Sequence, residues 1–466
     1  MAAMAMLSPD AVEKIADAAK DLLQDPGVML EDAEIVDKLL AAGARPGARP
    51  GVVRLEPTMV DDWIGRAPRR FALADRRGIR TEVGPDTASL FWTGAAIFYS
   101  DERGFRPITR ADLSDFARLI DALPQVHGIV GTAMDDTPPP HQDFVGLRLM
   151  AGATRKHLRA LSFTPRGGEA MIEMGRVLAG PAGLRANPVI SLGFTAHGPL
   201  RWTGLALRIF KATAGHGVPV TVNGEPMAGA SAPVTLAGTA AVGTAEILAG
   251  IVVNQVLEPG RPCFFNLGFS HVMYMRRGFA VTGGPENCLL AAAGADVARH
   301  FGLPSASWMC SDSLLADSQN SLEKMLAAVT HTQARVSVVW GVGQLESEKT
   351  LSPVQAVIDD EIAAMARRYA GGFAVDDKSL AVEEVRSTGI AGSFLGTEHT
   401  LEHFRGAIYE PRHLVRNQRS HGAPQRDLLE NAKEFVRTVL ARPREPHLRD
   451  EDARELERIE RSYAST

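Results

Sequence analysis

Polar side chains follow two apolar runs in the middle of the chain. Asn223 and Glu225 come directly after the β-branched run 218–222, and Asn266 lies in the run 261–268. Such runs, bounded by glycine or proline, are typical of strands, and parallel strands bind ligands at their carboxyl ends. We therefore expect these three side chains at a ligand site. The alternative is that they fix a buried loop by hydrogen bonding.

Two acidic residues lie just past other predicted strand ends. Asp312 follows the run 304–311, and Glu346 follows the run 335–343. Either carboxylate could face a positive charge on a ligand, and with Glu225 and Asn266 they complete our predicted catalytic set. The alternatives are a helix N-cap for Asp312 and a solvated loop position for Glu346.

Aromatic residues lie near the ends of several predicted strands. Trp308 and Trp340 lie in consecutive predicted strands, and core packing would explain each residue singly. The family resemblance described below implies a cationic ligand, and for such a ligand we predict that this pair contributes to a cage, since a cation over an aromatic face gains roughly 0.5–2 kcal/mol. The predicted substrate-binding residues are Trp308, Trp340, Phe163, Phe265, Asn223, His197 and His399. The two histidines follow candidate strands, but a lone loop histidine is more often structural.

Residues that could bind a metal are scattered. His127, His141 and His157 lie on separate expected elements, and the three cysteines match neither a zinc pattern nor a disulfide framework. We therefore predict no protein-bound metal. Lys324 and Lys349 lie in helix or loop contexts, so no lysine at a strand end indicates a Schiff-base lyase or aldolase.

The elements that must position these residues alternate between strand and helix. Residues 218–222 and 261–268 flank a long apolar segment, 234–257, and two buried strands joined by a helix indicate a parallel sheet. The apolar segment is long enough to span a bilayer, but Glu246, Asn254 and Gln255 interrupt it. A buried barrel helix is the favoured interpretation.

The same alternation runs over about 270 residues and predicts a (β/α)8 TIM-type barrel. A doubly wound sheet is the rival, but the first strand lacks the glycine fingerprint that such a fold would carry. An eighth strand is weakly marked, and GSFLG (392–396) is the best candidate. The other strand candidates are 128–134, 159–165, 187–194, 218–224, 261–268, 304–311 and 335–343.

Additions flank the predicted barrel on both sides. Residues 1–125 are expected to form helices and a small antiparallel sheet, because helical periodicity gives way to short extended runs between turns. The barrel is expected over 126–424. Residues 425–466 are charged with helical periodicity, which predicts a C-terminal helical extension.

Composition narrows the function classes. The 466 residues are 45% hydrophobic and 23% charged with a net charge of −5, which is typical of a globular protein and gives no reason to expect nucleic acid or a membrane surface as partner. The start of the chain lacks the basic region of a signal peptide. Scattered cysteines fit a reducing compartment, so a cytoplasmic location is expected.

Several segments together resemble the trimethylamine methyltransferase family. The likeness is carried by 226–263 (PMAGASAPVTLAGTAAVGTAEILAGIVVNQVLEPGRPC) and extends over nearly the whole chain. It includes LLQDPGVMLEDAEIVDKLLAAGA (22–44), APRRFALADRRG (67–78), DDEIAAMARRYAGGFAVDD (359–377) and HTLEHFRGAIYEPRH (399–413).

The resemblance implies a barrel that moves a methyl group from an amine to a corrinoid (cobalamin) cofactor, which a separate small protein carries. The trimethylamine-specific branch contains pyrrolysine. This sequence has only the twenty standard residues, so it is similar to the branch without pyrrolysine, whose members demethylate quaternary amines such as glycine betaine. The expected function is therefore transfer of a methyl group from a small quaternary amine to Co(I).

Two alternatives remain open at the level of sequence. The donor could be another onium compound, either a different betaine or a sulfonium. The barrel could also bind a quaternary amine without catalysis and act through a partner, because a fold alone does not decide function. A homo-oligomer is compatible with the large additions around the barrel.

Overall fold

An eight-stranded parallel barrel forms the centre of the computed structural model, which describes residues 3–418 and 426–465. Its strand order is β15-β13-β11-β10-β9-β6-β19-β18. A bridge between Phe265 and Ser305 joins the two ends of that order, so the barrel closes. The (β/α)8 prediction is thereby confirmed. The barrel strands are β6 (Leu90–Thr93), β9 (Val126–Val130), β10 (His157–Arg159), β11 (Ile190–Thr195), β13 (Val220–Asn223), β15 (Cys263–Asn266), β18 (Ala306–Trp308) and β19 (Val338–Val342).

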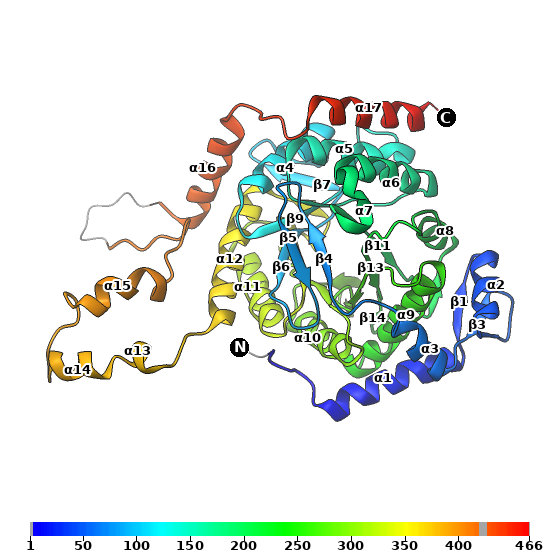
Figure 1. Ribbon diagram of the computed structural model, residues 1–466, viewed down its shortest axis with the longest axis horizontal. Helices are drawn as coiled ribbons and strands as arrows, with labels where there is room; N and C mark the ends of the chain where they lie inside the picture. Colours follow the sequence, from blue (N-terminus) through cyan, green and yellow to red (C-terminus); the bar gives the residue numbers. More distant parts are fainter. Residues whose placement is uncertain (1–2, 419–425, 466) are drawn as a thin grey trace.

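Helices cover the outside of the barrel (Figure 1). Their starts follow from the sequence, since Thr109 and Asp112 form a capping box at α4 and Ser352 caps α12 ahead of a proline. The helices that follow the strands are α4 (Arg110–Ala122), α5 (Gln142–Ala153), α6 (Pro165–Ala179), α8 (Gly204–Ala212), α9 (Leu236–Leu257), α10 (Pro285–His300), α11 (Ser318–Gln333) and α12 (Pro353–Gly371). A short α7 (Gly183–Ala186) precedes β11.

Helix α9 is apolar on every side. Within the described part of the chain it is the one helix long and apolar enough to cross a membrane, but 83% of its most apolar window is buried inside the protein. Glu246, Asn254 and Gln255, which interrupt its apolar sequence, are themselves buried. A helix that is hydrophobic all round is explained by burial between other elements, here between β13 and β15 on one side and α1 and α3 on the other.

The strand predictions were wrong at two places. Residues 90–93, which we placed in the small N-terminal sheet, form barrel strand β6 and pair in parallel with β9 and β19. Residues 392–396 form no strand. The barrel therefore begins inside the segment expected to precede it, and its last strand is β19.

The N-terminal segment also packs helices and short sheets around the barrel. Helix α1 lies against α9 and α10. The further elements are α1 (Pro9–Gln24), α2 (Ala33–Ala41), α3 (Pro57–Ile64), β1 (Val28–Leu30), β2 (Arg45–Pro46), β3 (Val52–Arg54), β4 (Phe71–Ala74), β5 (Arg80–Val83), β7 (Phe98–Asp101) and β8 (Gly104–Pro107). Short strands from the barrel loops join two of these sheets: β12 (Arg201–Trp202) pairs with β1, and β21 (Thr350–Leu351), itself paired with β20 (Gln344–Leu345), pairs with β7. A separate three-stranded sheet is formed by β14 (Met227–Ala228), β16 (His271–Tyr274) and β17 (Phe279–Val281).

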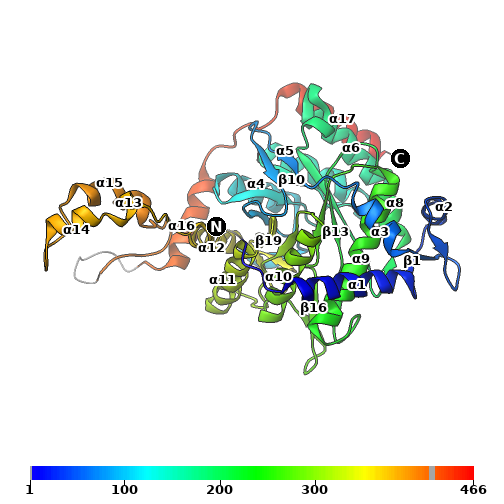
Figure 2. The ribbon, with the colours of Figure 1, turned by 60° about the horizontal axis from the view of Figure 1, so that its bottom comes forward.

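After α12 the chain leaves the barrel as an arm. Helices α13 (Asp377–Leu380), α14 (Val382–Thr388) and α15 (Glu398–Ala407) project away from the body, as both Figure 1 and Figure 2 show. Helix α16 (Leu428–Ala441) then packs on α12 and α4, and α17 (Asp450–Ala464) packs on α6 and α5. These two helices agree with the predicted C-terminal helical extension.

Candidate active site

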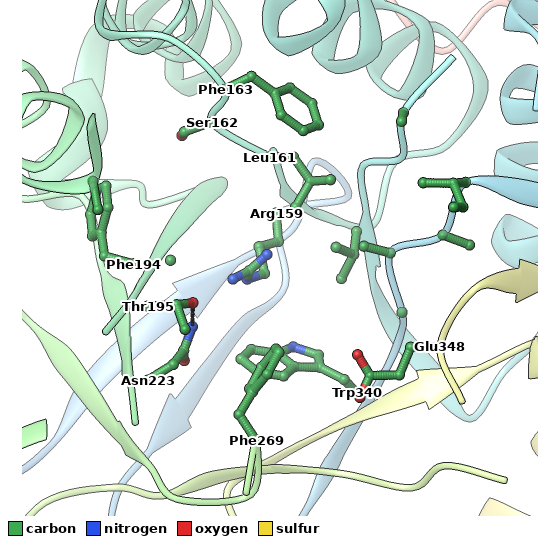
Figure 3. A pocket seen from close by; sticks show the side chains of 18 of the residues that line it. Arg159, Leu161, Ser162, Phe163, Phe194, Thr195, Asn223, Phe269, Trp340 and Glu348 are labelled. Carbon is green, nitrogen blue, oxygen red and sulfur yellow. Dashed lines mark hydrogen bonds between the residues drawn. The ribbon is translucent and has the colours of Figure 1, made fainter. Parts of the chain in front are cut away.

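A cavity of about 780 Å³ lies at the carboxyl end of the barrel strands. Each of the eight strands, or the loop that follows it, contributes to the wall. The contributing residues, in chain order, include Gly94, Val130, Arg159, Gly193, Asn223, Phe269, Trp308 and Trp340. This is where barrel enzymes place their chemistry, and Figure 3 shows the side chains that line it.

Three aromatic rings meet on one side of the cavity. The Phe269 ring lies 4.3 Å from Trp308 and 5.6 Å from Trp340 between centroids, edge to face in both pairs. The two tryptophan rings are 6.0 Å apart and nearly perpendicular. Edge-to-face rings of this kind present several π faces around one space, which is the arrangement that holds a quaternary ammonium.

The Trp308 ring is held in place by a neighbour. Its indole N–H donates to the Gln344 side-chain oxygen at 2.6 Å, and the Gln344 amide nitrogen donates to the Ala95 carbonyl. Gln344 occupies the space that a Cβ at Gly94 would fill. A glycine at position 94 therefore makes room for the residue that orients Trp308.

Arg159 places a buried positive charge in the wall of this cavity. Its side chain comes from the end of β10 into the cavity, is only 6% exposed, and lies with its guanidinium carbon 4.8 Å from the Trp340 ring centroid. Among the described residues its guanidinium makes one hydrogen bond, to the Thr221 hydroxyl at 3.3 Å, and its Nε makes none. Burial lowers the pKa of Arg159 to about 10, so the side chain stays protonated at neutral pH.

No carboxylate lies within ion-pair distance of Arg159 among residues 3–418 and 426–465. A buried charge without a counter-charge is costly. The structure nevertheless makes room for it, because a Cβ at Gly193 would overlap the guanidinium. A site that accommodates a buried, unpaired guanidinium is suited to a ligand with an anionic group.

The loop after β19 carries a carboxylate into the same cavity. Glu346, Ser347 and Glu348 all have positive φ, at 56°, 47° and 82°, which is unfavourable for residues other than glycine. The Ser347 hydroxyl donates to Asp312 at 2.5 Å, and the Glu346 and Ser347 amides donate to the Ser313 and Ser311 carbonyls. These bonds hold the strained loop, and the strain directs Glu348 into the wall.

Other ionisable groups surround Glu348. Burial raises the pKa of Glu348 to about 7, against the opposing effect of His271 and with the added repulsion of Glu225 and Asp312. Burial alone would lower the pKa of His271, but Glu225 at 3.5 Å and the charges of Glu348 and Asp312 raise it overall. Glu348 is therefore poised to change its charge near neutral pH.

A chain of amides lies opposite these charges. The Asn266 side chain donates to Asn223 at 2.8 Å, and the Asn223 amide donates to the Thr195 hydroxyl at 3.0 Å. Asn223 lines the cavity, whereas Asn266 lies behind it and accepts from the Gly268 amide. Asn266 therefore orients Asn223.

The structure brings together some of the predicted site residues. Trp308, Trp340, Phe163, Asn223 and His197 line the cavity. Glu225 and Asp312 lie beside it and act on Glu348 and His271 through their charge. Asp312 is not a helix N-cap, since its carboxylate accepts from the Thr282 and Gly283 amides and Asp317 caps α11.

Three predicted site residues lie elsewhere. Phe265 is fully buried and packs in the core between strands and helices, because neighbouring residues of a strand point to opposite faces and Phe264 takes the barrel interior. The Glu346 carboxylate accepts from Thr350 at 2.8 Å and lies outside the cavity wall. His399 lies on α15 in the arm, with its ring 4.6 Å from His403.

Neither Arg159 nor Glu348 is among the site residues predicted from the sequence. The sequence does contain a hint of the position of Arg159. Arg159 is two residues after His157 at the end of a buried strand, so both side chains point to the same face, opposite to that of Leu158. We instead took it as the start of the strand 159–165, which the structure ends at 159. The position of Glu348 depends on three consecutive residues with left-handed backbone conformation. Residue spacing in the sequence does not predict such a conformation. The described residues include no group of three or more histidine, cysteine or acidic side chains arranged for a metal ion.

Comparisons with known proteins agree with this architecture. At 28% identity, the trimethylamine methyltransferase MttB of Desulfitobacterium hafniense (strain DSM 10664 / DCB-2) aligns over 410 residues, 86% of this chain and 82% of its own. A glycine betaine methyltransferase of D. hafniense (strain Y51) is 27% identical over 414 residues, 87% of this chain and 86% of its own.

A solved structure shares the fold. The crystal structure of the Methanosarcina barkeri monomethylamine methyltransferase (MtmB) superimposes with a TM-score of 0.56 at 14% identity, over 93% of this chain and 89% of its own. The family model described as trimethylamine methyltransferase (MTTB) matches residues 1–465. The chain thus belongs to the trimethylamine methyltransferase family.

Proposed function

We propose that this methyltransferase takes a methyl group from a small quaternary amine that also carries a carboxylate, such as glycine betaine, and passes it to the Co(I) of a corrinoid on a partner protein. The observation that carries the proposal is the pairing, in one cavity, of an aromatic cluster with a buried arginine that lacks a carboxylate partner in the described chain. One end of the donor is thereby matched as a cation and the other as an anion.

The cationic end of the donor fits the rings of Trp308 and Phe269, whereas the Arg159 guanidinium already lies over the Trp340 ring. Each π face contributes roughly 0.5–2 kcal/mol to binding an onium group. In the view of Figure 3 the Arg159 guanidinium and the Glu348 carboxylate lie on different parts of the wall. A donor that carries both charges can place its carboxylate on Arg159 and its ammonium against the aromatic rings.

A donor without a carboxylate would leave Arg159 unpaired. Neither trimethylamine nor choline carries an anionic group that could accept hydrogen bonds from Arg159, so neither offsets the cost of burying the guanidinium. Their binding should be correspondingly weaker than that of a betaine. This reasoning separates the proposed donor from the one named in the trimethylamine methyltransferase relatives.

The chemistry needs orientation more than proton transfer. The corrinoid supplies a Co(I) nucleophile when its carrier protein is bound. The C–N bond of the quaternary ammonium breaks, its electron pair stays on nitrogen, and the product leaves as a neutral tertiary amine. No proton is added or removed, so the residues of this chain act by fixing the donor and excluding water.

The rim of the cavity has the character that such a carrier would need. Ile97 and Leu205 line the cavity and are half exposed, at 50% and 47%, and they would lie against the corrinoid and its carrier protein. Exposed apolar side chains beside a cavity are suited to docking a partner. We place this reaction in the cytoplasm, because Co(I) persists only in a reducing environment.

Spectroscopy tests the proposal directly. Purified protein is mixed with chemically reduced cob(I)alamin and then with glycine betaine, other betaines, sulfoniums, choline and trimethylamine, each separately. Loss of the Co(I) absorbance together with release of dimethylglycine is the expected result for glycine betaine. Loss of the Co(I) absorbance with a sulfonium and with no quaternary amine would show that the donor is a sulfonium. Binding of a betaine by calorimetry without transfer, even with the cognate corrinoid protein, would favour a non-catalytic binding barrel.

A further inference from the structure

The arm formed by residues 373–408 has no core of its own. None of the side chains on α13, α14 or α15 is buried. Two of these helices nevertheless have N-terminal caps: Asp376 and Ser379 form a capping box at α13, and Thr397 caps α15. An ordered segment in which no helical side chain is buried requires an explanation in terms of what covers it.

The exposed side chains of the arm are strongly apolar. On α15, Leu401 and Phe404 lie one helical turn apart and share a face with Ile408, and on α14 Val382 and Val385 do the same. A large exposed apolar surface marks an interaction site. Eleven large hydrophobic residues of the arm are between 41% and 105% exposed: Phe373, Val375, Leu380, Val382, Val385, Ile390, Phe394, Leu395, Leu401, Phe404 and Ile408.

The arm leaves the barrel at the end opposite the cavity. Helix α12 runs back along the barrel after β19, and near its C-terminus Arg367 reaches the Ser89 carbonyl, which immediately precedes β6. The arm therefore begins at the amino ends of the strands. A corrinoid protein that must reach the cavity mouth would approach the other end of the barrel, so it is not the partner that this arm fits.

A groove of about 930 Å³ lies at the base of the arm. It is formed by the start of the chain, the C-terminal ends of α11 and α12, and the two ends of the arm where they meet the body. Its apolar and aromatic residues include Met365, Tyr369 and Phe373, of which Tyr369 is 61% exposed. The groove thus continues the apolar surface of the arm onto the body, since Phe373, Val375 and Ile408 of the arm line it together with Met365 and Tyr369.

The charges of the arm and the groove are complementary. Residues 373–408 carry six acidic side chains against three basic ones. The described residues that line the groove include Arg335, Arg368 and Arg416 and no acidic side chain. An acidic, apolar arm and a basic, apolar groove on one chain are matched for contact between two copies.

We propose that residues 373–408 are an exchange arm that binds the basal groove of a second copy of this chain, which returns its own arm across a two-fold axis. The same arm and the same groove then meet twice, as a closed two-fold interface requires. An arm of this length is comparable to the about 20–30 residues that each partner contributes to a stable interface. Both cavity mouths stay uncovered in the dimer.

Sedimentation velocity of the full-length protein over a concentration series tests the exchange. A particle of twice the 50.0 kDa chain mass is expected. The arm variant Leu401→Asp/Phe404→Asp and the groove variant Tyr369→Asp should each sediment as a monomer. Leu322→Asp, on the outer face of α11 and 74% exposed, adds one charge at an exposed apolar position, as the groove variant does, and should remain dimeric. All four changed side chains are exposed, so the variants should fold, which their circular dichroism checks.

Mixing the two monomeric variants gives the sharper result. An arm variant keeps an intact groove and a groove variant keeps an intact arm, so their mixture can form one of the two contacts and should dimerise partly. Monomeric wild-type protein at every concentration would overturn the proposal, as would a dimer that survives the arm substitutions. An arm that binds the corrinoid protein while the wild type stays monomeric would also overturn it.

Discussion

Arg159 is the residue that separates the donors this cavity should accept from those it should bind weakly. Its guanidinium is buried against Trp340 and lacks a counter-charge in the described chain. Sequence reasoning found the aromatic half of the site from tryptophans near strand ends, but it missed this charge. An arginine at a strand boundary is usually solvated, and only the closed barrel shows that it points inward.

Replacing Arg159 by methionine should remove the preference for carboxylate-bearing donors. We expect the dissociation constant of glycine betaine to rise by about 10- to 100-fold, in line with the about 1.5–3 kcal/mol of hydrogen bonds to a charged group. The constant for tetramethylammonium should hardly change, because that ligand has no carboxylate. Isothermal calorimetry on both ligands measures this, and Arg159→Lys should fall between, since it keeps the charge and loses the planar fork. Equal weakening of both ligands would contradict this role.

Glu348 should make donor binding depend on pH. Its pKa is raised to about 7, so the side chain is mostly protonated and neutral below that pH and ionised above it. An ionised carboxylate favours a cationic donor, and binding should therefore strengthen as the pH rises from 6 to 8. Titrations of wild type and Glu348→Gln at several pH values measure this. The variant should bind as weakly at pH 8 as at pH 6, and a slope that survives the substitution would assign the dependence to another group.

At the scale of elements, periodicity predicted the barrel and missed its first strand. The strand–helix–strand unit around α9 is as expected, because long apolar segments and β-branched runs are strong signals. Strand β6 has only four residues, Leu90–Thr93, and lies among hairpin strands. Nothing in its sequence says that its partners are the distant β9 and β19, since pairing partners are set by the whole fold. The candidate at 392–396 drew on a local apolar pair that belongs to the arm.

Strand β11 leaves room for the Arg159 side chain because it has a glycine at position 193. A Cβ at Gly193 would overlap the guanidinium and approach the Thr221 hydroxyl. Gly193→Ala should therefore displace Arg159 and weaken glycine betaine binding, as Arg159→Met does, while leaving tetramethylammonium binding nearly intact. Calorimetry on the two ligands provides the comparison. As a control, Gly152→Ala adds the same methyl group on α5, where no atom lies within 4 Å of it, and it should bind both ligands normally.

At the scale of the whole molecule, our two proposals assign separate tasks to the two ends of the barrel. The cavity and its apolar rim are at the carboxyl ends of the strands, while the arm and its groove are at the amino ends. Partners that approach one end leave the other accessible. The docking of a corrinoid protein and the pairing of two chains can therefore be disturbed independently.

Acidic substitutions on the rim should slow methyl transfer to the corrinoid carrier protein more than methyl transfer to the free cofactor. In Ile97→Asp/Leu205→Asp, the apolar surface beside the cavity becomes acidic. We expect methyl transfer from glycine betaine to the corrinoid protein to fall by more than about tenfold, since truncating a central interface residue typically costs more than 1 kcal/mol and two are changed. Transfer to free cob(I)alamin should be far less affected. Comparing the two rates decides between a docking role and a role in the cavity, and Leu322→Asp serves as a control for an added charge at an exposed apolar position away from the rim.

The unpaired guanidinium inside the barrel has a consequence for how this protein can evolve. A charge held away from water without a counter-charge subtracts from the stability of the ligand-free fold, and an apolar side chain of similar length in its place would be accommodated more easily. Selection for heat resistance alone would then discard Arg159 early, along with the donor specificity that we propose for it. Selection for methyl transfer would retain it and would have to recover the lost stability at positions far from the cavity.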